Sequence, residues 1–148
     1  DAMTKEVSTM LCAKEYEVAE AVGRLKNEQT RMKSQIAELQ QKLLKFCVAE
    51  IPVDEKIVTV FDGSLSGNLP REMMNQLLDK GAVICAVFAG TDEEGYRYVI
   101  GSRSEDVRSI SKTLNSTLEG RGGGKPEMVQ GSVKGTEDAV KEIIARYQ

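Results

Sequence analysis

Apolar residues recur at alternating spacings of four and three along the first third of the chain, with Gln29 at the one polar position of the series. This is the heptad pattern of a coiled coil, in which each apolar side chain enters a hole on a facing helix. The pattern predicts a long helical segment over residues 1–50, ended by Pro52. We call the apolar series the heptad seam: Val18, Val22, Leu25, Met32, Ile36, Leu39, Leu43 and Phe46.

The seam needs a facing surface, and the sequence leaves two sources open. A shorter apolar segment, residues 7–13, allows a preceding helix that folds back on the seam and makes an intramolecular helical hairpin. The alternative is a second copy of the chain, which would make a homodimer through a coiled coil. In that case Val18, Val22, Leu25, Met32, Ile36, Leu39 and Leu43 are the oligomerisation residues.

After Pro52 the pattern becomes that of a sheet. Residues 57–61 and 82–89 are continuous apolar runs of strand length, which predicts two strands in the centre of a sheet. Residues 69–80 between them have helical spacing, and Gly81 follows as a C-cap. Strand, helix and strand in this order form a βαβ unit.

The remaining elements follow from turn and cap signals. An acidic turn returns the chain into a strand over residues 96–100. Ser104 is the expected N-cap of the next helix, which Gly120 ends, and the last helix is expected to begin near Thr136. The glycine-rich segment 120–135 is therefore expected to connect two helices. The resulting prediction is an α/β fold: a helical segment, residues 1–50, and a small sheet domain of βαββαα order, residues 51–148.

Composition narrows the chemistry. Histidine is absent, which removes the commonest general base and metal ligand, and the three cysteines have no metal-binding spacing. We therefore expect no catalytic residue, metal site or cofactor in this chain. No apolar run reaches the length of a membrane span, so we expect no membrane partner and a reducing, cytoplasmic setting. The opening residues, DAM before a charged heptad helix, indicate a C-terminal piece of a longer protein.

Charge distribution matters more than net charge. The net charge of −3 argues against a nucleic-acid partner. The acidic excess, however, lies in the middle of the chain, whereas basic and acidic residues nearly balance in the last third, where the glycines cluster.

The segment GRGGGKPEMVQGSVKG, residues 120–135, combines six glycines with Arg121, Lys125 and Lys134. Glycine backbone beside a helix N-terminus suits a phosphate group. The spacings of a P-loop and of a dinucleotide-binding motif are both missing, which argues against nucleotide hydrolysis. Two interpretations remain open: a phosphate-contacting loop, or a connector that only packs against the sheet.

The motif RGGGKPEMVQG resembles the glycine signature of the domain that ends alanyl-tRNA synthetases and long-form alanyl-tRNA editing proteins, and that also accompanies DHH-family phosphoesterases. The family pattern is three glycines, a variable stretch, then a small residue, Gln and Gly. Here Val129 occupies the position of the usual Ala. The phosphoesterases typically have His where this chain has Lys125, and the stretches EMVQGS and LSGNLPREM resemble the long-form editing proteins most.

The resemblance implies a tRNA-binding, dimer-supporting C-terminal module. It would assist hydrolysis of alanine-accepting tRNA mischarged with serine or glycine by an upstream zinc-dependent editing domain, so the parent would be an aminoacyl-tRNA deacylase although this chain is not itself an enzyme. The alternatives are the C-terminal domain of an alanyl-tRNA synthetase and a purely structural oligomerisation module. Arg103, Arg108 and Lys112 would extend the basic patch if their helix lies beside the loop. The expected tRNA-binding residues are Arg121, Gly122, Gly123, Gly124, Lys125, Gln130, Gly131 and Lys134.

Overall fold

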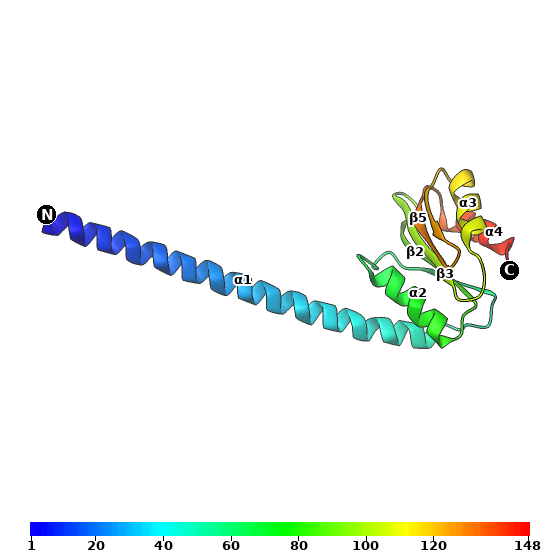
Figure 1. Ribbon diagram of the computed structural model, residues 1–148, viewed down its shortest axis with the longest axis horizontal. Coiled ribbons are helices and arrows are strands. Elements are labelled where there is room, and N and C mark those ends of the chain that lie inside the picture. Colours follow the sequence, from blue (N-terminus) through cyan, green and yellow to red (C-terminus); the bar gives the residue numbers. More distant parts are fainter. The chain divides into compact units, whose positions relative to one another are not determined.

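The computed structural model describes residues 1–148 and contains four helices and five strands (Figure 1). It divides into two compact units, Asp1–Leu43 and Leu44–Gln148. In chain order the elements are α1 (Ala2–Glu50), β1 (Ile57–Phe61), α2 (Leu69–Lys80), β2 (Ile84–Thr91), β3 (Gly95–Ser102), α3 (Arg108–Thr117), β4 (Arg121–Lys125), β5 (Met128–Val133) and α4 (Glu137–Ala145).

The helix α1 is unbroken, so the helical-hairpin alternative is wrong: residues 7–13 continue the helix and do not fold back. Good helix formers connect them to the seam, and Gly23, with open space around it, costs only about 1 kcal/mol. Every residue of the seam is exposed, from 44% at Val22 to 75% at Phe46. No helix combines the length and apolar character that a membrane span requires.

The five strands form one mixed sheet of order β1-β2-β3-β5-β4, in which only β1 and β2 are parallel. The prediction that β1 is central is wrong, because β1 is an edge strand. Its apolar run is explained by cover on both faces, since Ile57 and Val58 belong to opposite cores. The side chain of Gln148 caps this edge: its Oε1 accepts from Ile57 N at 3.0 Å and its Nε2 donates to Ile57 O at 3.1 Å.

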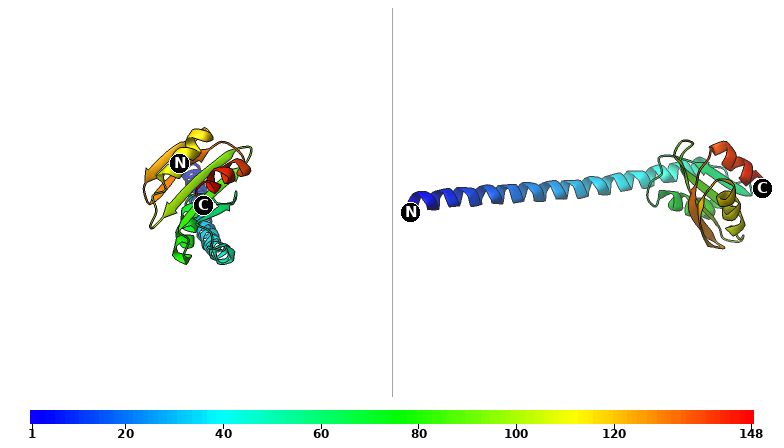
Figure 2. Two further views of the ribbon diagram at one scale, coloured as in Figure 1. Left: turned by 90° about the vertical axis from the view of Figure 1, so that its right-hand side faces the viewer. Right: turned by 90° about the horizontal axis from the view of Figure 1, so that it is seen from above.

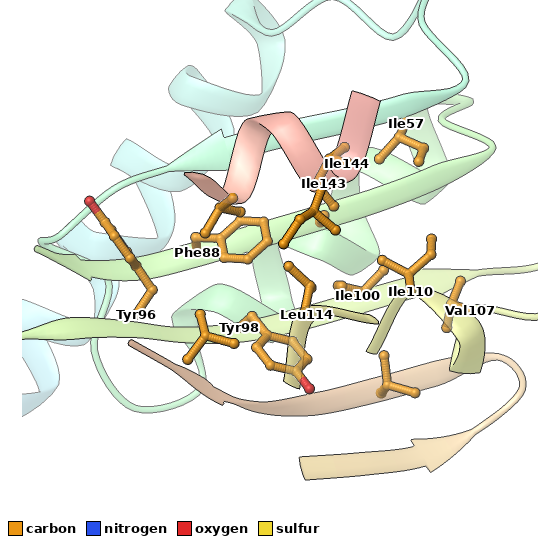
Figure 3. Close-up of a cluster of buried hydrophobic side chains, with 14 of the residues drawn as sticks. Ile57, Phe88, Tyr96, Tyr98, Ile100, Val107, Ile110, Leu114, Ile143 and Ile144 are labelled. Carbon is orange, nitrogen blue, oxygen red and sulfur yellow. The ribbon is translucent and has the colours of Figure 1, made fainter. Parts of the chain in front are cut away.

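Helices cover both faces of the sheet. α3 and α4 lie on one face of the sheet (Figure 2). Phe88, Ile100 and Leu114 are completely buried on this face (Figure 3). α2 and the last turns of α1, from Leu44 onward, lie on the other face. The ammonium group of Lys80 at the end of α2 donates to three carbonyls at the end of α1, at 2.6 to 3.0 Å, and so caps that helix.

The glycine-rich segment is not the connector that was expected. It forms the hairpin of β4 and β5, so the order of the sheet domain is βαββαββα. In β5 the buried Val129 and Val133 alternate with the exposed Gln130 and Ser132, which is the period of a half-buried strand. β5 pairs with β3, and this long-range pairing also draws the glycines of β4 into the sheet.

Cap predictions had mixed outcomes. The N–H of Gly81 donates to the carbonyls of Leu77 and Leu78, which confirms the predicted C-cap. The predicted start of the last helix near Thr136 is also confirmed, and Thr136 Oγ1 accepts from Ala139 N at 3.1 Å as its N-cap. Ser104 does not cap α3, which begins at Arg108. The hydroxyl of Ser102 instead accepts the N–H groups of residues 104 and 105, and so holds this segment in a turn before the helix.

Candidate nucleic-acid interface

β4 is the outermost strand of the sheet, and all five of its residues are exposed. Its register with β5, and that of β5 with β3, brings residues on one face of the three strands into cross-strand rows. The three rows are Arg97–Ser132–Arg121, Val99–Gln130–Gly123 and Gly101–Met128–Lys125.

These rows lie on the sheet face that α2 covers only in part. Met73, Met74 and Leu77 of α2 pack over Val87 and Val99, on β2 and β3. Beyond Met128, which is half-buried, the cover ends, and the side chains of β5 and β4 that point to this side are exposed. We call this exposed region the basic sheet face: Arg97, Arg121, Gly123, Lys125, Gln130 and Ser132.

The glycines of β4 have two different roles. An added Cβ would lie 2.3 Å from Gln130 O at Gly122 and 2.4 Å from Met128 O at Gly124, so both positions require glycine for close packing on β5. A Cβ at Gly123 would meet nothing within 4 Å. Close packing therefore requires two of the three glycines. At Gly123 only the backbone conformation, with φ +158°, favours glycine, and the position leaves an open patch without a side chain in the middle row.

Gly131 is also explained by packing. A Cβ there would lie 2.7 Å from the hydroxyl of Tyr98, which is buried beneath the hairpin. That hydroxyl is 2.7 Å from Ser111 Oγ and donates to Asn115 Oδ1 at 2.9 Å. Asn115 Nδ2 donates in turn to Gly122 O at 3.2 Å. This polar chain ties the glycine strand to α3, and no motif in the sequence indicated it.

The structure brings most of the predicted binding residues together. Arg121 and Lys134 line one cleft of about 630 Å³, which Arg97 of β3 also lines. Two carboxylates, Glu94 and Glu119, line the same cleft and reduce its positive charge. Gln130 lines a smaller cleft of about 100 Å³ with Arg97 and with Arg71 from the first turn of α2.

Sequence reasoning missed Arg71 and Arg97. Arg97 is the one exposed residue between the buried Tyr96 and Tyr98, and this alternation was the signal that could have identified it as a surface cation of β3. Neither arginine has an acidic partner within the chain, and the same holds for Arg121, Lys125 and Lys134. These cations are therefore available to an external anion.

None of the three residues expected to extend the basic patch is an unpaired cation of the basic sheet face. Arg103 pairs with Asp79 of α2, and Arg108 pairs with Asp106 at 2.7 Å. The Arg108 guanidinium lowers the pKa of Asp106 to about 2. Lys112 lies on α3, whose helix covers the opposite face of the sheet from Arg97.

The titratable groups with shifted pKa values do not lie among the cations of this face. Burial raises the pKa of the Cys85 thiol, in the middle of β2, to about 12, which keeps it a protonated core residue. The hydrogen bond from Tyr96 Oη to Asp92 Oδ1, at 2.5 Å, raises the pKa of Tyr96 to about 12 and lowers that of Asp92. The basic sheet face thus offers cations, amide groups and open backbone, which are the groups of a binding surface.

A family model described as the DHHA1 domain matches residues 54–148. The chain is 25% identical over 149 residues to an alanine–tRNA ligase of Psychrobacter sp. (strain PRwf-1), with 93% of this chain and 16% of the ligase covered. It is 33% identical over 73 residues to an alanine–tRNA ligase of Acholeplasma laidlawii, with 47% of this chain and 9% of that protein covered. The chain thus spans only a small part of the length of these relatives.

Two solved structures show the same fold. The C-Ala domain from Aquifex aeolicus alanyl-tRNA synthetase has a TM-score of 0.50 and 19% identity, with 64% of this chain and 88% of that chain covered. RecJ from Thermus thermophilus, in complex with Mg²⁺, has a TM-score of 0.61 and 15% identity, with 81% of this chain and 18% of that chain covered. At these identities the similarity supports the fold alone.

Proposed function

The chain belongs to the DHHA1 domain family, and we propose that it binds tRNA through the basic sheet face, as the C-terminal module of a longer protein that acts on alanine-accepting tRNA. The observation that carries this proposal is the set of cross-strand rows, in which Arg97, Arg121 and Lys125 lie on one exposed face without acidic partners. The relatives named above are ligases of alanine and tRNA, which supports tRNA as the nucleic acid.

The geometry of the rows suits a phosphate backbone. Neighbouring strands are about 4.8 Å apart, so the Cα atoms of Arg97 and Arg121, two strands apart, are separated by about 10 Å. The outer rows are four residues apart along β4, or about 13 Å, which separates Arg121 from Lys125. Long basic side chains at these spacings can neutralise several phosphates at once. Such contacts give affinity for nucleic acid but no specificity for base sequence.

Gly123 and Gln130 occupy the row between these cations. Because Gly123 has no side chain and open space above it, a sugar-phosphate backbone can approach the strand closely there. Gln130 offers both a donor and an acceptor beside it. The absence of an exposed aromatic ring on this face favours backbone contact over base stacking.

The competing proposal is a structural oligomerisation module. The net charge of −3 and the exposed seam favour it, whereas the unpaired cations favour tRNA binding. The two functions are compatible in one chain, because the seam and the basic sheet face share no residue. We propose that the seam also forms a homodimer, since its side chains are 44% to 75% exposed in the single chain.

The parent protein is a separate proposal. The glycine motif resembles that of the long-form editing proteins, whereas the relatives named above are alanine–tRNA ligases. In either parent the chemistry would belong to another domain, with zinc in the case of the editing proteins. We expect the chain alone to release no amino acid from Ser-tRNA, with or without added zinc, and zinc-dependent turnover by the pure chain would contradict this.

The decisive test is tRNA binding by the full chain, measured by fluorescence anisotropy over a series of salt concentrations. We expect Arg97→Ala and Lys125→Ala each to weaken binding several-fold and to make the slope of log affinity against log salt shallower by about 0.7–0.9 for each phosphate interaction removed. The matched control is Arg146→Ala, which removes the same charge from an exposed position at the end of α4. We expect it to bind like the wild type.

Two outcomes would contradict the proposal. If the wild-type chain binds no tRNA although it is folded, the oligomerisation module alone is correct. If Arg146→Ala weakens binding as much as Arg97→Ala, the chain attracts tRNA by diffuse charge and not through this face.

A further inference from the structure

The polar residue Gln29 lies in the middle of the heptad seam. The spacing assigns Gln29 to the first core position of its heptad, together with Val22, Ile36 and Leu43. The second core position of each heptad is apolar throughout. Its residues are Val18, Leu25, Met32, Leu39 and Phe46.

We propose that the seam pairs with the seam of a second copy of this chain in a parallel, in-register coiled coil, in which the two Gln29 side chains face each other. The proposal rests on the self-association proposed above and goes beyond it by assigning orientation and register. Val22 and Ile36 at the first core position, with Leu25 and Leu39 at the second, are the combination that favours two strands over three or four.

Gln29 separates the two orientations. In a parallel, in-register pair each core residue faces its own counterpart, so the two amides meet, and each offers a donor and an acceptor to the other. In an antiparallel pair a first-position residue faces a second-position residue of the partner. Because every second-position residue is apolar, Gln29 would then lack a polar partner across the core.

The charges beside the core favour the same orientation. In a parallel pair the flanking residue Glu28 faces Lys33 of the partner helix, an attractive contact that occurs twice by symmetry. Within one chain Glu28 pairs with Arg31, and Lys33 has no acidic partner. An antiparallel pair would instead bring Lys26 and Lys33, which flank the same side of the core, toward each other as like charges.

The last residue of the seam, Phe46, belongs to the sheet-domain unit and is exposed there. Leu44 and Val48 of α1 are buried against that domain at 3% and 7% exposure. Leu43 and Phe46, on the same turns, are 64% and 75% exposed. Phe46, the one seam residue within the sheet-domain unit, is therefore free to contact a partner helix, because that domain buries Leu44 and Val48 instead.

Disulfide trapping tests the orientation. The background is the full chain with Cys12→Ser and Cys47→Ser, which removes the two cysteines that are not buried. Leu43→Cys and Val18→Cys are made separately in this background, and Cys85 stays in the core of all samples as a shared control. Each variant is oxidised alone, and the two are also mixed, with one carrying a size tag, under conditions that allow subunit exchange.

We expect each variant alone to form its own disulfide, because a parallel register brings identical positions within the Cα separation that a disulfide needs, about 4.4–6.8 Å. An antiparallel register would leave each variant alone uncrosslinked and would trap a Val18→Cys chain to a Leu43→Cys chain in the mixture. That result would overturn the proposal. Gln29→Leu sharpens the test, since we expect mixed disulfides to appear once the polar pair is removed.

Sedimentation equilibrium of the unmodified chain distinguishes failure of the inference from failure of its premise. If the chain is a monomer at high micromolar concentration and no sample forms a disulfide, the self-association on which the proposal rests is contradicted. A dimer that yields only mixed disulfides would leave self-association intact and refute the parallel register.

Discussion

The two compact units of this chain use apolar residues in opposite ways. The unit Leu44–Gln148 buries its large apolar side chains within one chain, with Ile57, Leu77 and Phe88 at 0% exposure. The unit Asp1–Leu43 has no buried residue, and Leu25 of its seam is 70% exposed. Residue type therefore does not decide burial in this chain. An apolar side chain is buried where another surface of the same chain packs against it.

This difference implies two kinds of stability. The sheet domain folds against itself, so its free energy of unfolding should not depend on protein concentration. The helix buries its seam only against a partner, so its stability should rise with concentration by mass action. Substitutions in either unit can test this contrast.

The largest effect is expected in the core of the sheet domain. Phe88 stacks on Phe61 at 4.9 Å between ring centroids and lies 6.2 Å from the ring of Tyr98. We expect Phe88→Ala to lower the free energy of unfolding by about 3–5 kcal/mol, at any protein concentration, because it leaves a cavity. Urea unfolding followed by circular dichroism measures this, and Phe88→Leu should cost less. A loss below about 1 kcal/mol would show that the core repacks around the site.

A change in the seam is expected to act on association alone. Ile36→Glu places a charge in the core of the proposed coiled coil and should weaken the dimer by about 2–3 kcal/mol or more. Sedimentation equilibrium measures this change, and the melting of the sheet domain should not move. Ser34→Glu is the control, because it adds the same charge outside the seam. An unchanged dimer in Ile36→Glu would show that another surface holds the chains together.

The two kinds of glycine in β4 give a third contrast. We expect Gly124→Ala to destabilise the sheet domain by about 1–3 kcal/mol, since its Cβ would lie 2.4 Å from a backbone oxygen of β5. Gly123→Ala should cost about 1 kcal/mol, because residues with side chains rarely adopt its φ of +158° although its Cβ would meet nothing within 4 Å, and it should weaken tRNA binding. Thermal melts and anisotropy titrations of both variants measure this. Unchanged tRNA binding in Gly123→Ala would mean that the ligand does not approach β4.

A smaller effect is expected at the start of α4. Thr136→Ala removes the hydroxyl that accepts from Ala139 N and should cost about 1 kcal/mol of domain stability. Asp92 Oδ1 also accepts from Glu137 N, at 2.9 Å, and so satisfies a second N–H of this helix end. Thr136→Ser should restore the stability in urea unfolding. No loss in Thr136→Ala would indicate that Asp92 alone suffices as a cap.

The smallest effect is a pH dependence that belongs to the sheet domain. The pKa of Asp92 is lowered by the hydrogen bond from Tyr96, so its stabilising contribution is present above the unfolded pKa and is lost as pH falls through the folded value. The pKa of Tyr96 is raised to about 12, so stability falls as pH rises between about 10 and 12. We expect Asp92→Asn to flatten both slopes in urea unfolding. Unchanged slopes would assign them to other groups.

Local patterns in the sequence predicted many of the elements. The period of the apolar residues identified the α1 seam, and the spacing in residues 69–80 identified α2 with its correct ends, because a helix and its caps depend on neighbours a few residues away. The apolar run of β1 was also located with its correct ends. These features depend on short-range sequence and need no knowledge of what lies beside them.

The glycine hairpin and the basic sheet face could not be predicted in this way. Three of the five residues of β4 are glycines, so its sequence shows no pattern of apolar and polar positions. It is a strand because β5 pairs with both β4 and β3. Arg97 joins Arg121 only through that pairing, across residues far apart in the chain, and both are exposed only because α2 stops short of β5. Short-range periodicity was therefore enough to locate the helices, most strands and the apolar seam that lacks a partner within the chain. Tertiary structure decided the strand order, which glycines are needed for packing and which cations share a face, because these depend on contacts between distant segments.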